Sequence, residues 1–179
     1  MCTDIFELLQ QRRSVRKYQE KEVESEKIEQ LLEAAVLAPS AANFQPWRFK
    51  VIENQDIIEE LRKEAMVAFN TNWMSKGTLK LIAVCADPTK TVDKYGERGE
   101  NLYIIQDTAA AIQNILLKAP TLGLGTCWIG GFNEEKVEEI LNLDSSLEIY
   151  AFITVGYPEE KLGPRTSRRD LSEVVSYIK

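Results

Sequence analysis

The segment from Asn101 to about Lys118, NLYIIQDTAAAIQNILLK, constrains the fold more than any other part of the chain. Its apolar residues recur at helical spacing but cover much of the circumference, so a helix here needs burial on more than one side. Three consecutive alanines, Ala109, Ala110 and Ala111, would allow a second helix to approach closely. We therefore expect a helix that other elements enclose.

Helical and strand patterns alternate along the rest of the chain. Apolar residues at helical spacing, with candidate caps at Thr3 or Asp4, Ser25 and Asn133, predict helices in DIFELLQQ, EKIEQLLEAAVLA, DIIEELRKEAMVAF and NEEKVEEILNL. Strands are predicted in WRFKVIE, LKLIAVCAD and LEIYAFITVGYP. The polar pieces NTNWMSKG and Pro88 to Gly99 are interpreted as connections. This interleaving favours an α+β or α/β class with few strands.

Length and charge limit the class of protein. The 179 residues suit one domain, or one protomer of an intertwined oligomer. A net charge of −6 argues against nucleic-acid or anionic-membrane partners, which need a broad basic surface. No leader segment or membrane span is evident, and three widely spaced cysteines do not suggest a disulfide framework. We therefore expect a cytoplasmic protein.

Histidine is absent from the chain. Its absence excludes Ser-His-Asp and Cys-His nucleophilic machinery and histidine metal sites, and no metal site is expected. Cys127 could be considered a nucleophile, but without a histidine to lower its pKa a buried structural thiol is the favoured interpretation. The protein therefore either does no chemistry or takes its chemistry from a cofactor.

Arginine is concentrated at the two ends of the chain. Six of the nine arginines lie in residues 12–16 and 165–169. If the fold brings these clusters together they would bind a compact polyanion, because guanidinium groups match phosphate bidentately. On clustering alone, the favoured interpretation is that the two clusters are solvent-exposed and balance the negative charge of surface glutamates.

Glycine crowds into the segment after the apolar helix, at Gly123, Gly125, Gly130 and Gly131. A dinucleotide fingerprint fails because Trp128 occupies the third glycine position. The glycines could let backbone amides approach a flat ligand, or they could form a helix cap at Gly123 and a turn at Gly130–Gly131. These alternatives stay open.

Two further features could serve a ligand or the structure alone. The loop PSAANFQPW carries Ser40, Asn43 and Gln45, whose donors and acceptors suit a polar ligand but are also typical of turns. Trp47 and Trp128 could stack on a ring system, although aromatic residues beside strands more often belong to the core.

Four segments, in this order, resemble motifs of the nitroreductase family of FMN-dependent flavoproteins. They are RRSVRKY, APSAANFQPWRFKVI, QDTAAAIQNILLKAPTLGLGTCWIGGF, and VGYP followed by RRDLSEVV, and they run from end to end of the chain. The resemblance implies one domain over residues 1–179, with an α+β fold in which helices wrap a small, mostly antiparallel sheet. It also implies an intertwined homodimer in which the protomers exchange C-terminal arms, from about residue 159 to 179.

The resemblance also implies a cofactor site at the dimer interface, built from both chains. One protomer would hold the FMN phosphate, the ribityl chain and the N1–O2 edge, and would supply backbone contacts near N5 and O4; the other would reach the flavin with its polar loop. The implied residues are Arg12, Arg13, Ser14, Arg16 and Arg168, then Ile129, Gly130 and Gly131, and Ser40, Asn43 and Gln45 from the other protomer. Arg165 is a second candidate for the phosphate.

The implied activity is ping-pong hydride transfer from NADH or NADPH to flavin N5 and on to a nitro, quinone or similar small-molecule acceptor. No protein side chain would be catalytic, because flavin supplies the electron chemistry. Arg16, near N1, would stabilise the anionic reduced flavin. Two alternatives remain: an FMN storage or sensing protein without turnover, and a reductive dehalogenase-like flavoprotein. The stretch from about residue 70 to 100 is short for the helical excursion that lids the pocket in longer members.

Overall fold

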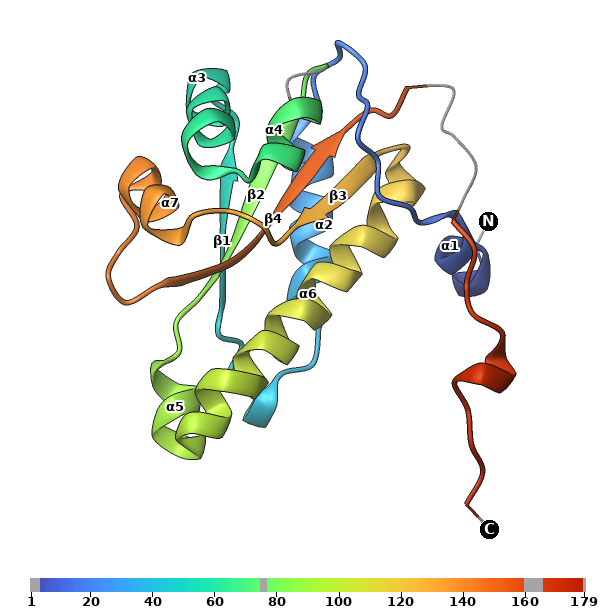
Figure 1. Ribbon diagram of the computed structural model, residues 1–179, viewed down its shortest axis with the longest axis vertical. Helices are drawn as coiled ribbons and strands as arrows, with labels where there is room; N and C mark the ends of the chain where they lie inside the picture. The colour runs from blue at the N-terminus through green and yellow to red at the C-terminus, as the bar shows by residue number, and fades with distance from the viewer. Residues whose placement is uncertain (1–3, 75–76, 160–165, 179) are drawn as a thin grey trace.

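The computed structural model describes residues 4–74, 77–159 and 166–178. A four-stranded sheet lies between two layers of helices (Figure 1). Its strands are β1 (Trp47–Ile52), β2 (Lys80–Ala86), β3 (Gly125–Ile129) and β4 (Glu148–Gly156), in the order β1-β2-β4-β3. Each neighbouring pair is antiparallel. The predicted α+β class with a small antiparallel sheet is confirmed.

Successive side chains of a strand point to opposite faces of the sheet. Each face is covered by a layer of helices, so hydrophobic side chains are buried on both faces. Along β2, Leu81, Ala83 and Cys85 join one hydrophobic cluster, while Ile82 and Val84 join another. β2 and β4 are therefore apolar on both sides at their centres, whereas in β1 the charged side chains of Arg48 and Lys50 alternate with Trp47, Phe49 and Val51.

The first helical layer consists of α2 (Ser25–Val36) and α6 (Ile104–Lys118). The buried side chains Ile112 and Ile115 of α6 pack in one cluster with Leu31 of α2 and with the sheet. Burial on more than one side is thus confirmed for α6. One side stays open, because Ile105 is 49% exposed and Ala109 and Ala110 are only partly buried.

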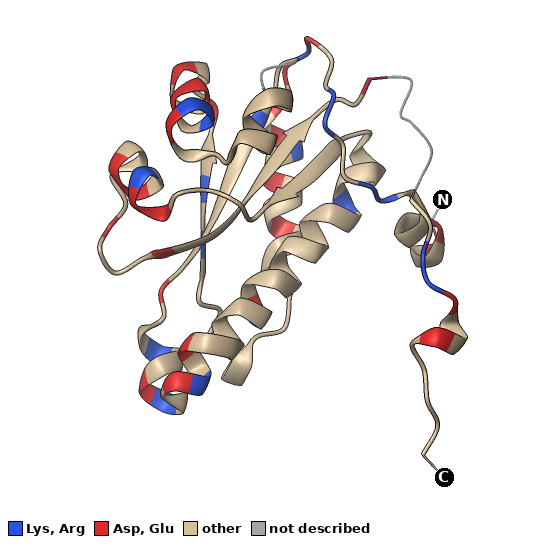
Figure 2. Ribbon diagram, in the orientation of Figure 1, with Lys and Arg blue, Asp and Glu red and all other residues tan. Residues whose placement is uncertain are grey.

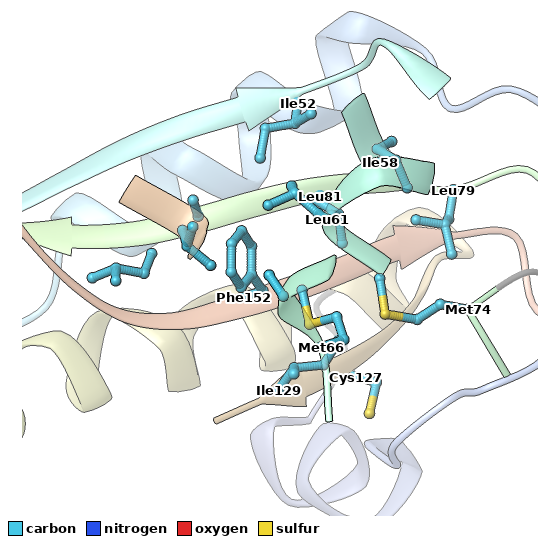
Figure 3. Close-up of a cluster of buried hydrophobic side chains, with 14 of the residues drawn as sticks. Ile52, Ile58, Leu61, Met66, Met74, Leu79, Leu81, Cys127, Ile129 and Phe152 are labelled. Atoms are coloured by element: carbon cyan, nitrogen blue, oxygen red, sulfur yellow. The ribbon is translucent and has the colours of Figure 1, made fainter. Parts of the chain in front are cut away.

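The second layer contains α3 (Gln55–Glu60), a π-helical turn (Leu61–Ala65), α4 (Ala68–Trp73) and α7 (Glu134–Leu141). Figure 3 shows its core, in which Phe152 of β4 lies among Leu61, Leu81 and Met66. The prediction of one continuous helix over DIIEELRKEAMVAF was wrong. Met66 takes an extended conformation and forms an antiparallel bridge with Phe132, which ends the first helix. α4 then begins at Ala68 and continues into the stretch that was interpreted as a connection.

The piece from Pro88 to Gly99 was also interpreted as a connection, and this was wrong as well. It forms α5 (Thr89–Tyr95), and just before the helix Asp87 Oδ1 accepts the N–H of Thr89 at 3.0 Å. A second π-helical turn (Gly99–Tyr103) then leads into α6. Thr91 faces inward, so α5 has little of the apolar stripe by which amphipathic helices are recognised.

The remaining helices are short and lie near the chain ends or between larger elements. α1 (Ile5–Gln11) begins where Asp4 accepts the N–H of Phe6, as predicted for one of its two candidate caps. Single 3-10 turns cover Ala41–Asn43, Ala119–Leu122 and Leu171–Glu173. Across the described part of the chain, the longest apolar helix falls short of what a bilayer crossing requires.

Candidate cofactor site

The arginine-rich segment RRSVRKY runs along the outer edge of β3. Ser14 forms a parallel bridge with Thr126, and the N–H of Val15 donates to Thr126 O at 2.8 Å. Tyr18 pairs with Pro158 at the end of β4. The segment therefore extends the sheet and fixes the course of its cationic side chains.

Tyr18 anchors this segment to the sheet through its hydroxyl group. Its hydroxyl donates to Val15 O at 2.8 Å and lies 2.7 Å from Thr154 Oγ1 on β4. Burial raises the pKa of this phenol above its ordinary value. Thr154 Oγ1 in turn accepts the N–H of Cys127 at 3.1 Å, so the hydroxyl network ties the arginine segment, β3 and β4 together.

Gly125 makes the close approach of the segment possible. A Cβ atom at this position would lie 2.8–2.9 Å from three side-chain atoms of Val15. Gly125 is thus required for packing of the protein against itself. Gly123 has φ +71 and caps the 3-10 turn after α6, so the cap interpretation is the correct one for that residue.

Arg12 and Arg13 line a cavity of about 200 Å³ at the carboxyl end of α6. Its walls also include Leu116, Pro120 and the backbone of Gly123 to Thr126. This volume lies below the roughly 300–1,000 Å³ of ordinary small-molecule pockets. Two partly buried arginines thus lie beside a cavity that could form part of an anion site.

Arg16 turns toward α4. Its guanidinium carbon lies 5.6 Å from the ring centre of Phe69 and 5.9 Å from that of Trp73, within cation–π range. Cys127 lies on the same side of β3, only 2% exposed, and burial raises the pKa of its thiol while Arg16 and Ser14 oppose that rise. The thiol stays protonated, in line with the structural interpretation of Cys127.

β3 ends at Ile129, and Gly130 and Gly131 follow it close to the same helix. Ile129 is buried in the core, whereas a Cβ at Gly130 would meet no atom within 4 Å. Gly131 O accepts the N–H of Val67 at 3.3 Å and Asn70 Nδ2 at 3.2 Å. The open backbone at Gly130 thus lies next to the start of α4.

Phe69, Asn70 and Trp73 are candidate site residues that the sequence did not predict. The structure brings them to Arg16 and to Gly131. The indole Nε1 of Trp73 is buried and has no hydrogen-bond partner among the described residues. The sequence did contain an indication that the two aromatic residues act together. Phe69 and Trp73 are four residues apart, the spacing that places two side chains on one helix face.

The two tryptophans considered as stacking groups behave differently. Trp47 is 5% exposed and belongs to the core between the sheet and the α2–α6 layer. Trp128 is 41% exposed, so its assignment to the core was wrong. It lies between Cys127 and Ile129 on an edge strand, and alternation turns it to the opposite face.

Ser40, Asn43 and Gln45 lie in the loop between α2 and β1, at the amino end of α6. Ser40 Oγ accepts the N–H of Gln45 at 3.0 Å, and the Asp107 carboxylate of α6 accepts the N–H of Ala41 at 3.0 and 3.1 Å. Asn43 and Gln45 are exposed. The loop thus presents polar side chains to the outside of this chain.

Within one chain the two groups of predicted residues are far apart. The loop is tied to Asp107, whereas the cavity of Arg12 and Arg13 is lined by Leu116. The nine residue steps from Asp107 to Leu116 correspond to a rise of about 14 Å along an α-helix. Figure 1 shows the same separation, with the loop after α2 at one end of α6 and the blue segment after α1 at the other.

Arg168 lies in the C-terminal arm, which leaves the body of the chain (Figure 1). Its guanidinium is exposed and donates to the backbone carbonyls of Thr166 and Ser167 at 3.2 and 3.1 Å. Arg165 lies outside the described residues. The charge map in Figure 2 places cationic residues in the arm and in the segment after α1, both in the part of the molecule around α1.

Several large apolar side chains are exposed in the single chain. They belong to α1, to the end of α2, to α6 and to the arm, and include Ile5, Phe6, Leu37, Ile105, Leu171, Val174, Tyr177 and Ile178. Contiguous exposure of large apolar side chains is typical of interaction surfaces.

Known proteins resemble this chain over nearly its whole length. A model described as Nitroreductase family matches residues 9–157. The NADH dehydrogenase of Thermus thermophilus is 32% identical over 188 residues, covering 92% of this chain and 91% of its own. A nitroreductase family protein from Streptococcus pneumoniae superposes with a TM-score of 0.86 at 26% identity, covering 97% and 100%. An FMN-dependent nitroreductase from Clostridium difficile gives 0.76 at 27%, covering 95% and 96%.

Proposed function

This chain belongs to the nitroreductase family, and on that basis we propose that it is an FMN-dependent oxidoreductase that takes a hydride from NADH or NADPH. We further propose that it passes the electrons to a nitro compound, a quinone or a similar small acceptor in ping-pong fashion. When bound, FMN supplies the two-electron chemistry, and the protein binds and orients it.

The observation that carries this proposal is that the arginine segment after α1, helix α4 and the end of β3 lie together. Arg16 stands over Phe69 and Trp73, the backbone of Gly130 is open, and Asn70 is bonded to Gly131. The polar edge of a flavin could be bound by the cation of Arg16, the unpartnered indole N–H of Trp73 and the open backbone of Gly130. A buried donor without a partner is costly, so it calls for a ligand or water.

In this proposal Arg12, Arg13, Ser14 and Arg16 bind the phosphate, the ribityl chain and the N1–O2 edge, and Arg168 completes the phosphate site. Ile129, Gly130 and Gly131 offer backbone contacts near N5 and O4. The cation–π contacts hold the charge of Arg16 in place, so that it favours negative charge developing near N1. Cys127 remains a neutral thiol and does not compete for the cation.

We also propose that the site is completed by a second copy of the chain. Ser40, Asn43 and Gln45 lie at the far end of α6 from Arg12 and Arg13, so a copy whose α6 runs antiparallel would bring its loop to them. The open side of α6 and the exposed apolar residues of the arm give such a dimer a surface to bury.

The test starts from purified protein, whose extracted cofactor is identified as FMN or FAD. The protein is then mixed anaerobically with NADH or NADPH while flavin absorbance is followed. We expect FMN and rapid bleaching with at least one nucleotide, followed by reoxidation when a nitroaromatic or a quinone is added. A Lys136→Ala variant, which removes an exposed cation on α7, serves as a control and should behave like the wild type.

Two outcomes would contradict the proposal in different ways. Bound FMN that neither nucleotide reduces would favour the storage or sensing alternative. Reduction by nucleotide with release of halide from a halogenated acceptor, and no reduction of nitro or quinone compounds, would favour the dehalogenase-like alternative.

A further inference from the structure

Asp107 is a buried carboxylate in the helical layer, outside the proposed phosphate site. It is 6% exposed, and both of its oxygens face the N–H of Ala41, at 3.0 and 3.1 Å. Burial raises its pKa, which means that the fold keeps a carboxylate where the charged form is disfavoured. Such a group is normally retained for a specific bond rather than for stability.

The loop whose Ala41 N–H donates to Asp107 has a strained backbone. Ala42, Asn43 and Gln45 have φ values of +49, +55 and +51. Side-chain-bearing residues rarely occupy this left-handed region, because Cβ comes too close to the following carbonyl oxygen. Three such residues within four positions persist only where the surroundings impose them.

Three contacts impose the loop conformation, and they have different origins. Ser40 Oγ accepts the N–H of Gln45 at 3.0 Å within the loop itself. Arg48, at the start of β1, donates to Gln45 O at 3.2 Å. Asp107 reaches the first turn of the loop from α6, so it ties the strained segment to a rigid helix of the core.

We infer that Asp107 is a positioning residue, which holds Ser40, Asn43 and Gln45 in the conformation proposed to contact FMN. This inference rests on the proposed function, because it takes the loop to be a flavin contact. Asp107 does not touch the cofactor itself. It acts by fixing Ala41, after which the chain enters the left-handed turn.

The first experiment measures FMN affinity of the full chain by flavin fluorescence, together with hydrogen exchange of the Ala41 amide. Asp107→Ala should weaken FMN binding about tenfold or more and speed that exchange, because a buried charge-assisted bond is lost. Asp107→Asn keeps an acceptor and should stay within about threefold. Thr108→Val is the matched control: it removes a buried hydroxyl that donates to Ile104 O within α6, and should leave affinity unchanged.

A rescue variant separates positioning from general destabilisation. Glycine enters the left-handed region without a Cβ clash, so Ala42→Gly lowers the strain that Asp107 otherwise balances. In the Asp107→Ala background, Ala42→Gly should recover about threefold or more of the lost affinity. A purely structural carboxylate would gain nothing from the removal of one methyl group in an exposed loop.

The outcomes distinguish failure of this inference from failure of the proposed function. If Gln45→Ala weakens FMN binding but Asp107→Ala does not, or if Ala42→Gly restores nothing, the positioning role is refuted while the loop contact stands. If Gln45→Ala and Asp107→Ala both bind FMN like the wild type, the proposed contact between loop and flavin is refuted, and the inference falls with it.

Discussion

Replacement of Tyr18 by phenylalanine tests how the arginine segment is held. The hydroxyl bonds to Val15 O and to Thr154 Oγ1 at 2.8 and 2.7 Å, and the side chain is 3% exposed. The change removes one oxygen and leaves the ring, so it creates almost no cavity. Its effect therefore reports the two hydrogen bonds and little else.

The magnitude follows from which groups lose their partners. Thr154 Oγ1 keeps the N–H of Cys127 at 3.1 Å, so it remains satisfied. Val15 O loses a buried donor, which costs about 1–3 kcal/mol of the free energy of unfolding. Because Val15 lies between Ser14 and Arg16, a segment that is held less firmly must be ordered when FMN binds. We expect FMN affinity to fall by about three- to tenfold, which corresponds to up to about 1.4 kcal/mol.

The assay needs two measurements on the same variant. Urea unfolding of the apo chain gives the change in stability, and flavin fluorescence gives the FMN dissociation constant. Tyr157→Phe is the control, since it removes a buried-tyrosine hydroxyl that bonds to Glu24 and Lys27 at 2.6 and 2.7 Å, away from the arginine side chains. The control should lose stability without losing FMN affinity. Equal FMN affinity in Tyr18→Phe and the wild type would refute the idea that this hydroxyl positions the segment.

Two further predictions concern the phosphate site and the buried carboxylate. The double variant Arg12→Ala with Arg168→Ala should bind FMN about a hundredfold more weakly or worse, because each proposed guanidinium–phosphate contact contributes about 1.5–3 kcal/mol. We expect the variant to sediment like the wild type, as the proposed dimer, and undiminished FMN affinity would refute the phosphate assignment. For Asp107 the folded-state pKa lies above the ordinary value, so the folded chain binds more protons than the unfolded one and the free energy of unfolding falls as pH rises through that pKa. Asp107→Asn cannot ionise, so its melting temperature relative to wild type should be higher at about pH 7 than at about pH 4, and the opposite trend would contradict the raised pKa.

The three strands with strong apolar patterns were predictable, as were α1, α2 and α7. β3 was not predicted, because Gly125 to Ile129 lies between glycines and reads as part of a turn. Only its pairing with β4 on one side and with Ser14 on the other makes this segment a strand. Strand formation here depends on contacts distant in sequence, which local patterns do not carry.

The candidate site likewise contains residues that the sequence could predict and residues that it could not. The residues proposed from motifs, such as Arg16 and Gly130, depend on residue type and order, so the sequence was sufficient to nominate them. Phe69, Asn70 and Trp73 enter the site because Met66 breaks the predicted helix and turns the chain toward Gly131. That break depends on the bridge between Met66 and Phe132, a contact between segments far apart along the chain.

The arrangement of α6 connects the fold to the proposed second chain. Its two ends carry the two halves of the proposed site, about 14 Å apart by helical rise, and a rigid helix of the core cannot bring its own ends together. In the proposed dimer, the two halves would therefore come from different copies of the chain. The same helix exposes Ile105 and the partly buried Ala109 and Ala110, small enough for close approach of a partner. Cofactor binding and dimerisation would then depend on one surface, so a substitution that separates the two α6 helices should weaken FMN binding even though it touches no residue of the phosphate site.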